Sequence, residues 1–246
     1  MLQKDSIADD IALAFDAIEE LRRQSPLVHC ITNSVAQQIT ANVLLACGGT
    51  ASMTISPEEV PFFTAASRAL LVNLGTLDDT RIQAIRLSVQ TARDNGIPII
   101  LDPVKCELSP PRLAFARELL EQGDVILKVN RREYEALSNS TTQCLVITGV
   151  TDEIQCDGSI VKVANGHSFM DRTIATGCAL GALIAALSAV SPSPRIAALA
   201  GLVWFGVAGE LASETASGPG SFLPAFLDNL ANLQTETISQ RARINE

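Results

Sequence analysis

Four short apolar segments stand out in the first two thirds of the chain, each bounded by polar or turn-forming residues. Three of the four are rich in valine and isoleucine, which is typical of strands buried on both faces of a sheet. A fifth segment, Thr50–Ile55, follows a helix-like stretch over Ala36–Ala46 and is also expected to be a strand. The four segments are Leu70–Leu74, Ile97–Leu101, Val125–Val129 and Leu145–Ile147.

Helical patterns separate these predicted strands. The stretch Asp78–Asp94 places Ile82, Ile85 and Val89 on one face, and Arg112–Leu120 has the same periodicity. Strands and helices therefore alternate along the chain. This alternation predicts an α/β fold with a central, mostly parallel sheet covered by helices on both faces.

The pattern changes near Thr151. Two short segments on either side of Asp157-Gly158 read as a β-hairpin with a type I′ turn. Beyond the hairpin the chain is expected to be all-helical, over Thr176–Val190, Arg195–Ala212 and a last helix from about Phe222. Because no linker or internal repeat interrupts the sequence, residues 1–246 are predicted to form a single domain.

Two apolar stretches invite comparison with membrane helices. Ala175–Val190 is short for a membrane span, and Ile196–Ala212 contains Trp204 near its middle and a glutamate, Glu210, towards its end. Both are expected to be buried helices, with no membrane as a partner. The first 24 residues form a polar, acidic stretch unlike a signal peptide, which predicts a cytoplasmic protein.

Composition narrows the classes of function. Hydrophobic residues make up 47% of the 246 residues and charged residues 18%, enough apolar surface for a large core. The net charge of −9 argues against nucleic acid as a partner. No C-x-x-C pair is present, so neither a disulfide framework nor a zinc site is expected, and a reducing compartment fits. The six cysteines are Cys30, Cys47, Cys106, Cys144, Cys156 and Cys178.

Polar residues follow the predicted strands at Asn73, Asp102, Asn130 and Thr148, and Glu133 comes shortly after Asn130. Turns favour such residues for structural reasons, so each one alone has a structural explanation. Ligands of open α/β sheets, however, bind at the carboxyl ends of the strands. Two carboxylates near a phosphate suit Mg²⁺. No Walker motif or G-x-G-x-x-G fingerprint follows a strand, which disfavours P-loop and dinucleotide-binding proteins.

A glycine-containing turn, Thr176-Gly177-Cys178, opens the most apolar predicted helix. Free N–H groups and the helix dipole at such a position suit an anion. The same environment is expected to lower the pKa of the Cys178 thiol. The alternative is a buried structural cysteine at a helix start that is capped by Thr176.

Taken in order, these motifs resemble the hydroxyethylthiazole kinase family of the ribokinase-like superfamily, from about Ser25 to Leu230. The resemblance rests on motifs distributed over nearly the whole chain. They are Pro26–Asn33, Thr40–Ala46, Leu101–Val104, Asn130-x-x-Glu133, Val146–Gly149, Asn165–His167, Thr176–Cys178, Phe205–Glu210 and Gly218–Phe222.

The resemblance implies phosphorylation of the hydroxyl of 4-methyl-5-(2-hydroxyethyl)thiazole by ATP and Mg²⁺ in thiamine salvage. It also implies a homo-trimer in which Asn33 and Met53 face Cys178 of a neighbouring chain. By position, the implied roles are metal binding for Asp102 and Glu133, ATP contact for Lys128 and Thr148, thiazole contact for Met53, Ala175 and Asn33, and catalysis for Cys178 with Gly177.

The chain departs from the family pattern around the phosphates. Lys105 and Glu107 stand where the family has glycines, Ala175 replaces another glycine, and Lys128 replaces an arginine. The link between Glu133 and the next strand is also about one helix shorter. Two alternatives therefore remain open: a catalytically impaired member that acts as a binding or interaction protein, and a kinase for a different small alcohol.

Overall fold

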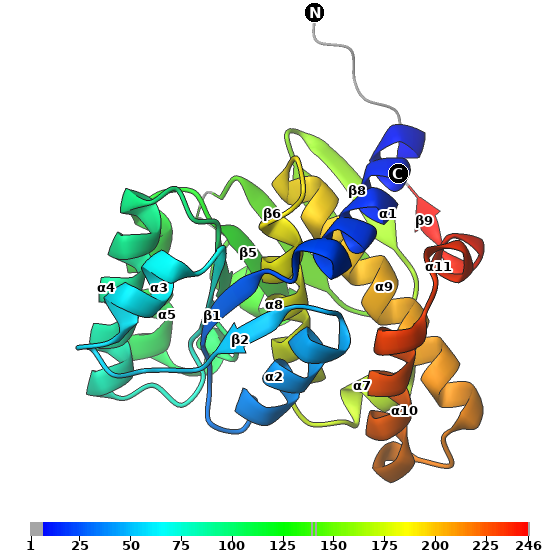
Figure 1. Ribbon diagram of the computed structural model, residues 1–246. Helices are drawn as coiled ribbons and strands as arrows, with labels where there is room; N and C mark the ends of the chain where they lie inside the picture. Colours follow the sequence, from blue (N-terminus) through cyan, green and yellow to red (C-terminus); the bar gives the residue numbers. More distant parts are fainter. Residues whose placement is uncertain (1–6, 139, 141, 246) are drawn as a thin grey trace, which may run out of the picture.

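The computed structural model describes residues 7–138, 140 and 142–245, and within them nine strands form one sheet (Figure 1). The strand order is β2-β1-β3-β4-β5-β6-β7-β8-β9, parallel from β2 to β6 and antiparallel from β6 to β9. The strands are β1 Leu27–Ile31, β2 Thr50–Ser52, β3 Ala69–Asn73, β4 Ile99–Asp102, β5 Ile126–Asn130, β6 Cys144–Thr148, β7 Asp152–Cys156, β8 Ser159–Val163 and β9 Ile244–Asn245.

Helices cover both faces of this sheet (Figure 1). Helices α3 to α6 pack on one face, and α1, α2 and α7 to α11 pack on the other. The helices are α1 Ile7–Gln24, α2 Gln37–Ala46, α3 Val60–Ala66, α4 Asp79–Asp94, α5 Pro110–Glu121, α6 Arg131–Ala136, α7 Ser168–Asp171, α8 Thr176–Ser188, α9 Pro194–Thr215, α10 Pro219–Asn232 and α11 Thr235–Arg241, and η1 Cys106–Leu108 is a 3₁₀ turn.

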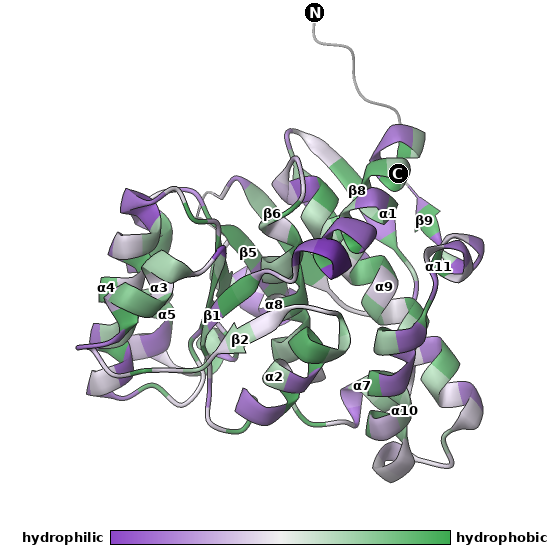
Figure 2. Cartoon of the chain, viewed as in Figure 1, coloured by the Kyte–Doolittle hydropathy of each residue, from purple (hydrophilic) through white to green (hydrophobic). Residues whose placement is uncertain are grey.

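The parallel strands are apolar on both faces because both faces are covered. In β3, Ala69 and Leu71 belong to the core under α8 and α9, whereas Leu70 and Val72 belong to the core under α4 and α5. All four side chains are fully buried. This is the period-two division that a doubly covered strand requires. Figure 2 shows the resulting hydrophobic colour concentrated on the central strands and on α8.

The predicted α/β fold is confirmed, including strands β3 to β6 and the helical C-terminal part. The turn at Asp157-Gly158 has positive φ at both residues, 52° and 74°, as a type I′ hairpin demands. Predicted strand Thr50–Ile55 is shorter than expected and ends at Ser52. The sequence patterns did not predict β1, α3, α6, α7 or α11. They also missed the short β9, which pairs with β8, so the C-terminal part is mostly but not entirely helical.

Helix α9 is long and apolar enough to span a membrane by length and composition, and no other helix among the described residues meets both criteria. However, 83% of its apolar window is buried inside the protein. Trp204 and Phe205, at its centre, are almost fully inaccessible. The helix is therefore packed as a core element, in agreement with the sequence-based interpretation.

One expectation about the cysteines is wrong. Cys144 of β6 and Cys156 of β7 are register partners and form a disulfide, with their Cα atoms 4.6 Å apart. No sequence motif marks this pair, because it is the antiparallel pairing of the two strands that brings the residues together. The other four cysteines are buried and free.

Candidate functional site

The carboxyl ends of five neighbouring parallel strands place polar residues along one edge of the sheet. Asn73 at the end of β3 is the register partner of Asp102 at the end of β4, and Asn130 of β5 is the partner of Thr148 of β6. Asn33 follows β1, the strand next to β3. The structure therefore brings together the polar strand ends that the sequence pattern singled out.

At the centre of this edge lies a buried ion pair. The Lys128 ammonium is 3.2 Å from Asp102 Oδ2, and the two side chains are only 6% and 1% exposed. Lys128 Nζ also donates a hydrogen bond of 3.0 Å to the carbonyl of Gly177 in the first turn of α8. Burial alone would lower the pKa of Lys128, but the acidic groups around it, Asp102 foremost and then Cys178 and Glu133, together outweigh burial and raise it. Lys128 is therefore a fixed positive charge between the sheet and α8.

Asp102 is held from a second side by amides. Asn73 Nδ2 donates to Asp102 Oδ2 at 2.9 Å, and Asn33 Nδ2 donates to Asn73 Oδ1 at 3.0 Å. Burial raises the pKa of the Asp102 carboxyl, while the Lys128 ammonium opposes this effect. Asn73 has a clear role in orienting Asp102. Asn73 was predicted at a strand end without a role in the site, although its alignment with Asp102 on the next strand was a usable signal.

Cys178 lies at the other end of this amide chain. Asn33 Nδ2 is 3.5 Å from Cys178 Sγ within the same chain, and not across an interface as expected. Burial and the nearby Asp102 carboxylate raise the pKa of the thiol to about 11, despite the opposing charge of Lys128. The expected lowering by the helix N-terminus is therefore wrong, because loss of solvation outweighs the dipole. At neutral pH Cys178 is a protonated thiol.

Glu133 supports the loop after β4. Its side chain is buried, and its two oxygens accept the backbone N–H groups of Lys105 at 2.7 Å and Asn130 at 2.8 Å. The second bond belongs to a capping box at the start of α6. Glu133 therefore fixes the β4 loop against the start of α6, a structural role that sequence reasoning did not foresee.

The donors present fit a magnesium ion. Asp102 Oδ1 is buried without a hydrogen-bond partner, and each Glu133 oxygen accepts one bond and retains a free lone pair. Mg²⁺ takes one or two carboxylates and keeps waters and phosphate oxygens in its remaining positions. Within the described residues no group of three or more His, Cys, Asp or Glu side chains forms a metal cluster. The residues present therefore fit an ion held by two protein carboxylates together with phosphate oxygens and water.

Two cavities adjoin at this edge and share Asn130, Thr148 and Gly177 in their walls. The first, called the charged cavity here, has a volume of about 490 Å³, and Asn33, Ala175 and Cys178 lie on its wall. Its charged lining residues are Asp102, Lys105, Arg112, Lys128 and Glu133.

The second, called the acidic cavity, has a volume of about 440 Å³ and is lined by two carboxylates, Asp152 and Asp171. Among the described residues on its wall there is no lysine or arginine. Burial raises the pKa of Asp152 to about 6, although the Gly149 N–H donates to its Oδ1 at 2.8 Å. The electrostatics therefore favour phosphates in the charged cavity and an uncharged group in the acidic cavity.

Comparison with known proteins agrees with this arrangement. The sequence profile described as "Hydroxyethylthiazole kinase family" matches residues 18–144 and 132–236. A "Probable hydroxyethylthiazole kinase" from Agrobacterium fabrum is 42% identical, over 95% of this chain and 95% of that protein.

Among solved structures, the hydroxyethylthiazole kinase protein from Pyrococcus horikoshii OT3 superimposes with a TM-score of 0.90 at 31% identity, over 95% of this chain and 98% of that chain. The chain belongs to the hydroxyethylthiazole kinase family. A pyridoxal kinase from Staphylococcus aureus has a TM-score of 0.63 at 12% identity, over 89% of this chain and 98% of that chain, which shows a common ribokinase-like fold. The phosphotransferase class that the sequence predicted is confirmed with the family.

Two of the departures from the family pattern lie at residues with an unusual backbone conformation. Lys105 and Ala175, which stand at glycine positions of the hydroxyethylthiazole kinase family, both adopt the left-handed backbone conformation, with φ of 55° and 62°. This region costs a non-glycine residue roughly 1–2 kcal/mol. At both positions the backbone has a conformation that favours glycine, and the chain bears the strain of a side chain there.

The shortened link after Glu133 is also visible. Among the described residues between β5 and β6, the short α6 is the one helix, and the two strands still pair in parallel. The two profile matches overlap in residues 132–144, which is the same link. Met53 packs against the core and is not among the described residues that line the charged cavity.

Proposed function

We propose that this protein transfers the terminal phosphoryl group of ATP, with Mg²⁺, to the hydroxyl of 4-methyl-5-(2-hydroxyethyl)thiazole. The observation that carries the proposal is the charged cavity of a hydroxyethylthiazole kinase family member, in which the buried Asp102–Lys128 pair lies beside Cys178. According to this proposal, the thiazole lies near Asn33, Ala175 and Cys178.

In this proposal the two cavities bind different parts of the nucleotide. The phosphates lie in the charged cavity near Lys128 and the start of α8, where the helix dipole and the ammonium favour negative charge. The nucleoside lies in the acidic cavity, where carboxylates disfavour phosphate and accept hydroxyl hydrogen bonds. Thr148, which lies on both walls, is the proposed ATP contact at the boundary.

Asp102 and Glu133 would hold Mg²⁺ through one or two direct or water-mediated contacts. When bound, the ion neutralises charge on the phosphate oxygens and orients them. Lys128 adds a fixed positive charge, and the Asn73–Asn33 pair orients Asp102. Because phosphoryl transfer depends mostly on positioning and charge stabilisation, these residues supply what the reaction chiefly requires.

Cys178 is proposed to position the acceptor hydroxyl as a neutral thiol. With a pKa of about 11, the thiolate fraction at pH 8 is roughly one in a thousand. We therefore expect Cys178→Ala to slow turnover moderately, about tenfold or less, with no new inflection in the pH–rate profile between pH 6 and 9. Alkylation of Cys178 by iodoacetamide, followed by mass spectrometry, should be slow below pH 9 and accelerate towards pH 11. Fast labelling at pH 7 would contradict a protonated resting thiol.

A coupled ADP-release assay tests the reaction itself. Purified protein, ATP and the thiazole alcohol should release ADP with Mg²⁺ present and lose that activity when the metal is chelated. Activity with another primary alcohol, and none with the thiazole, would assign a different acceptor. A protein that binds ADP tightly but forms no ADP from ATP under any condition would favour the binding-protein alternative.

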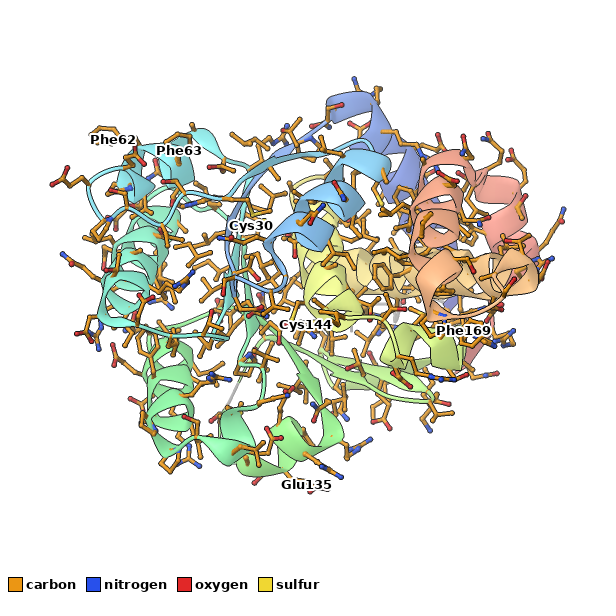
Figure 3. The ribbon with its side chains drawn as sticks, turned by 90° about the horizontal axis from the view of Figure 1, so that it is seen from below. Cys30, Phe62, Phe63, Glu135, Cys144 and Phe169 are labelled. Atoms are coloured by element: carbon orange, nitrogen blue, oxygen red, sulfur yellow. A yellow bond between two sulfur atoms is a disulfide. The ribbon has the colours of Figure 1, made fainter. Side chains whose placement is uncertain are left out.

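We also propose a homo-trimer in the cytoplasm, where ATP is available. Met53 reaches a thiazole only if a second chain brings it to the charged cavity, because it does not line the cavity of its own chain. Three exposed apolar side chains lie in the segments that flank the edge strand β2 in the sequence, one before α2 and two on α3. Val35, Phe62 and Phe63 are 61%, 76% and 41% exposed, and Figure 3 shows both phenylalanines at the outer edge.

The expected mass by light scattering is three times that of the 26.1 kDa chain. Activity per chain should fall on dilution below the dissociation constant of the assembly, because the site would lose Met53. A fully active protein with the mass of one chain would contradict a shared site.

A further inference from the structure

Lys105 occupies an unusual place on the loop that follows β4. Its backbone has a φ of 55°, in the left-handed region that a lysine rarely adopts, and its side chain is exposed. The residue lies on the wall of the charged cavity with Asp102, Lys128 and Glu133. Backbone strain of this kind persists where surrounding structure enforces it and is concentrated at functional sites.

The other two cations of the charged cavity are each held in place by a protein group. Lys128 is bound to Asp102 and to the Gly177 carbonyl, and Arg112 donates to the carbonyl of Val104. Within the described residues, by contrast, no hydrogen bond or ion pair engages the Lys105 ammonium. Its flexible four-carbon stem leaves this charge free to meet an anion in the cavity.

The backbone N–H of Lys105 is not free to bind phosphate. A glycine-rich phosphate loop usually offers its N–H groups to the anion. Here the N–H of Lys105 is donated to Glu133 Oε1 at 2.7 Å. Glu133 thereby also holds Lys105 in place, so that the side chain is the only group of this residue that remains available as a donor.

We propose that Lys105 binds the terminal phosphates of the nucleotide and supplies a positive charge that a glycine at this position lacks. This inference rests on the proposed kinase function and assigns a further phosphate-binding residue to the same site. Lys128 is neutralised by Asp102, and Arg112 is held at the Val104 carbonyl but keeps its charge. Lys105 therefore adds an exposed charge, unpaired among the described residues, to that of Arg112, which favours a polyphosphate in the cavity.

The test compares ADP and AMP binding, by isothermal titration calorimetry, for the wild type, Lys105→Gly, Lys105→Gln and Lys105→Arg. ADP affinity should fall roughly fivefold to tenfold in the Gly and Gln variants and be retained in the Arg variant. AMP affinity should change far less, because AMP lacks the terminal phosphates. Lys162→Gln removes an equally exposed lysine on β8, away from the cavity, and should bind ADP like the wild type.

Stability measurements separate this role from a structural one. Lys105→Gly removes the left-handed strain, so its unfolding temperature should equal or exceed that of the wild type while ADP binding weakens. An unchanged ratio of ADP to AMP affinity in the Gly and Gln variants would overturn the proposal, even if the protein phosphorylates the thiazole. Lys105-dependent ADP binding without thiazole turnover would instead uphold it and overturn the proposed acceptor. A wild-type protein that binds no ADP would overturn both.

Discussion

Asp102→Asn is expected to lower ATP-dependent turnover on the order of a thousandfold or more. The substitution keeps the shape of the side chain but removes the charge that faces Lys128 at 3.2 Å and that would hold Mg²⁺. Loss of a metal ligand and of charge stabilisation removes several kcal/mol from the transition state, about 1.4 kcal/mol for each tenfold in rate. Steady-state ADP release at saturating ATP and thiazole measures the effect.

The same change also leaves the buried Lys128 ammonium without its anion. Breaking a buried pair in this way costs about 3–5 kcal/mol, so stability must be measured beside activity. The double variant Asp102→Asn/Lys128→Met removes both charges and should recover much of the lost unfolding free energy without recovering turnover. Asp124→Asn, which changes an exposed carboxylate before β5, serves as the matched control and should be fully active. A folded Asp102→Asn protein with wild-type turnover would exclude Asp102 from the mechanism.

The edge of the sheet that carries the site was predictable because it depends on a local rule. An apolar strand followed by a polar residue is visible in the sequence, and parallel strands bring their carboxyl ends to one edge. Asp102, Asn130 and Thr148 were located in this way, and the register pairs in the structure agree. The same rule did not identify β1, because His29 interrupts its apolar run. In the fold His29 is buried, with partners at Thr64 Oγ1 and the Thr54 carbonyl.

The electrostatics of the site were not predictable, because they depend on contacts between distant segments. The helix N-terminus alone suggested an activated Cys178 thiolate. The structure places that thiol in a buried position near Asp102, which is 76 positions earlier in the chain, and the pKa rises to about 11. Asn33 likewise contacts Cys178 within one chain, because α8 packs over β1 and β3.

The lost glycines illustrate a third case, in which sequence identified the positions but not the outcome. Added bulk at Lys105 and Ala175 predicted a disturbed phosphate region. Both residues instead keep the left-handed backbone, and Glu133 still binds the N–H of Lys105. The backbone is thus set by the surrounding loop and helix, and the cost appears as local strain and not as a changed fold.

Gly206→Ala is expected to destabilise the protein by about 2–3 kcal/mol. A methyl group at this position of α9 would lie 2.6 Å from the Asn165 Cβ and 2.9 Å from its carbonyl carbon. Asn165 cannot easily move away, because three hydrogen bonds hold its side chain in place. It donates to Glu210 and to the Arg241 carbonyl, and it accepts the Arg243 N–H. Relief therefore requires a shift of the backbone that ties the C-terminal segment to β8.

For a chain of this size, that loss corresponds to a fall of roughly 5–10 °C in the thermal unfolding midpoint. ADP affinity should fall as well, since Gly206 and Asn165 both line the acidic cavity proposed to hold the nucleoside. Gly220→Ala in α10 is the matched control: a methyl group there meets no atom within 4 Å, and alanine favours the helix, so the midpoint should stay constant or rise slightly. If Gly206→Ala unfolds at the wild-type temperature, the contact between α9 and Asn165 is not a rigid part of the nucleotide site.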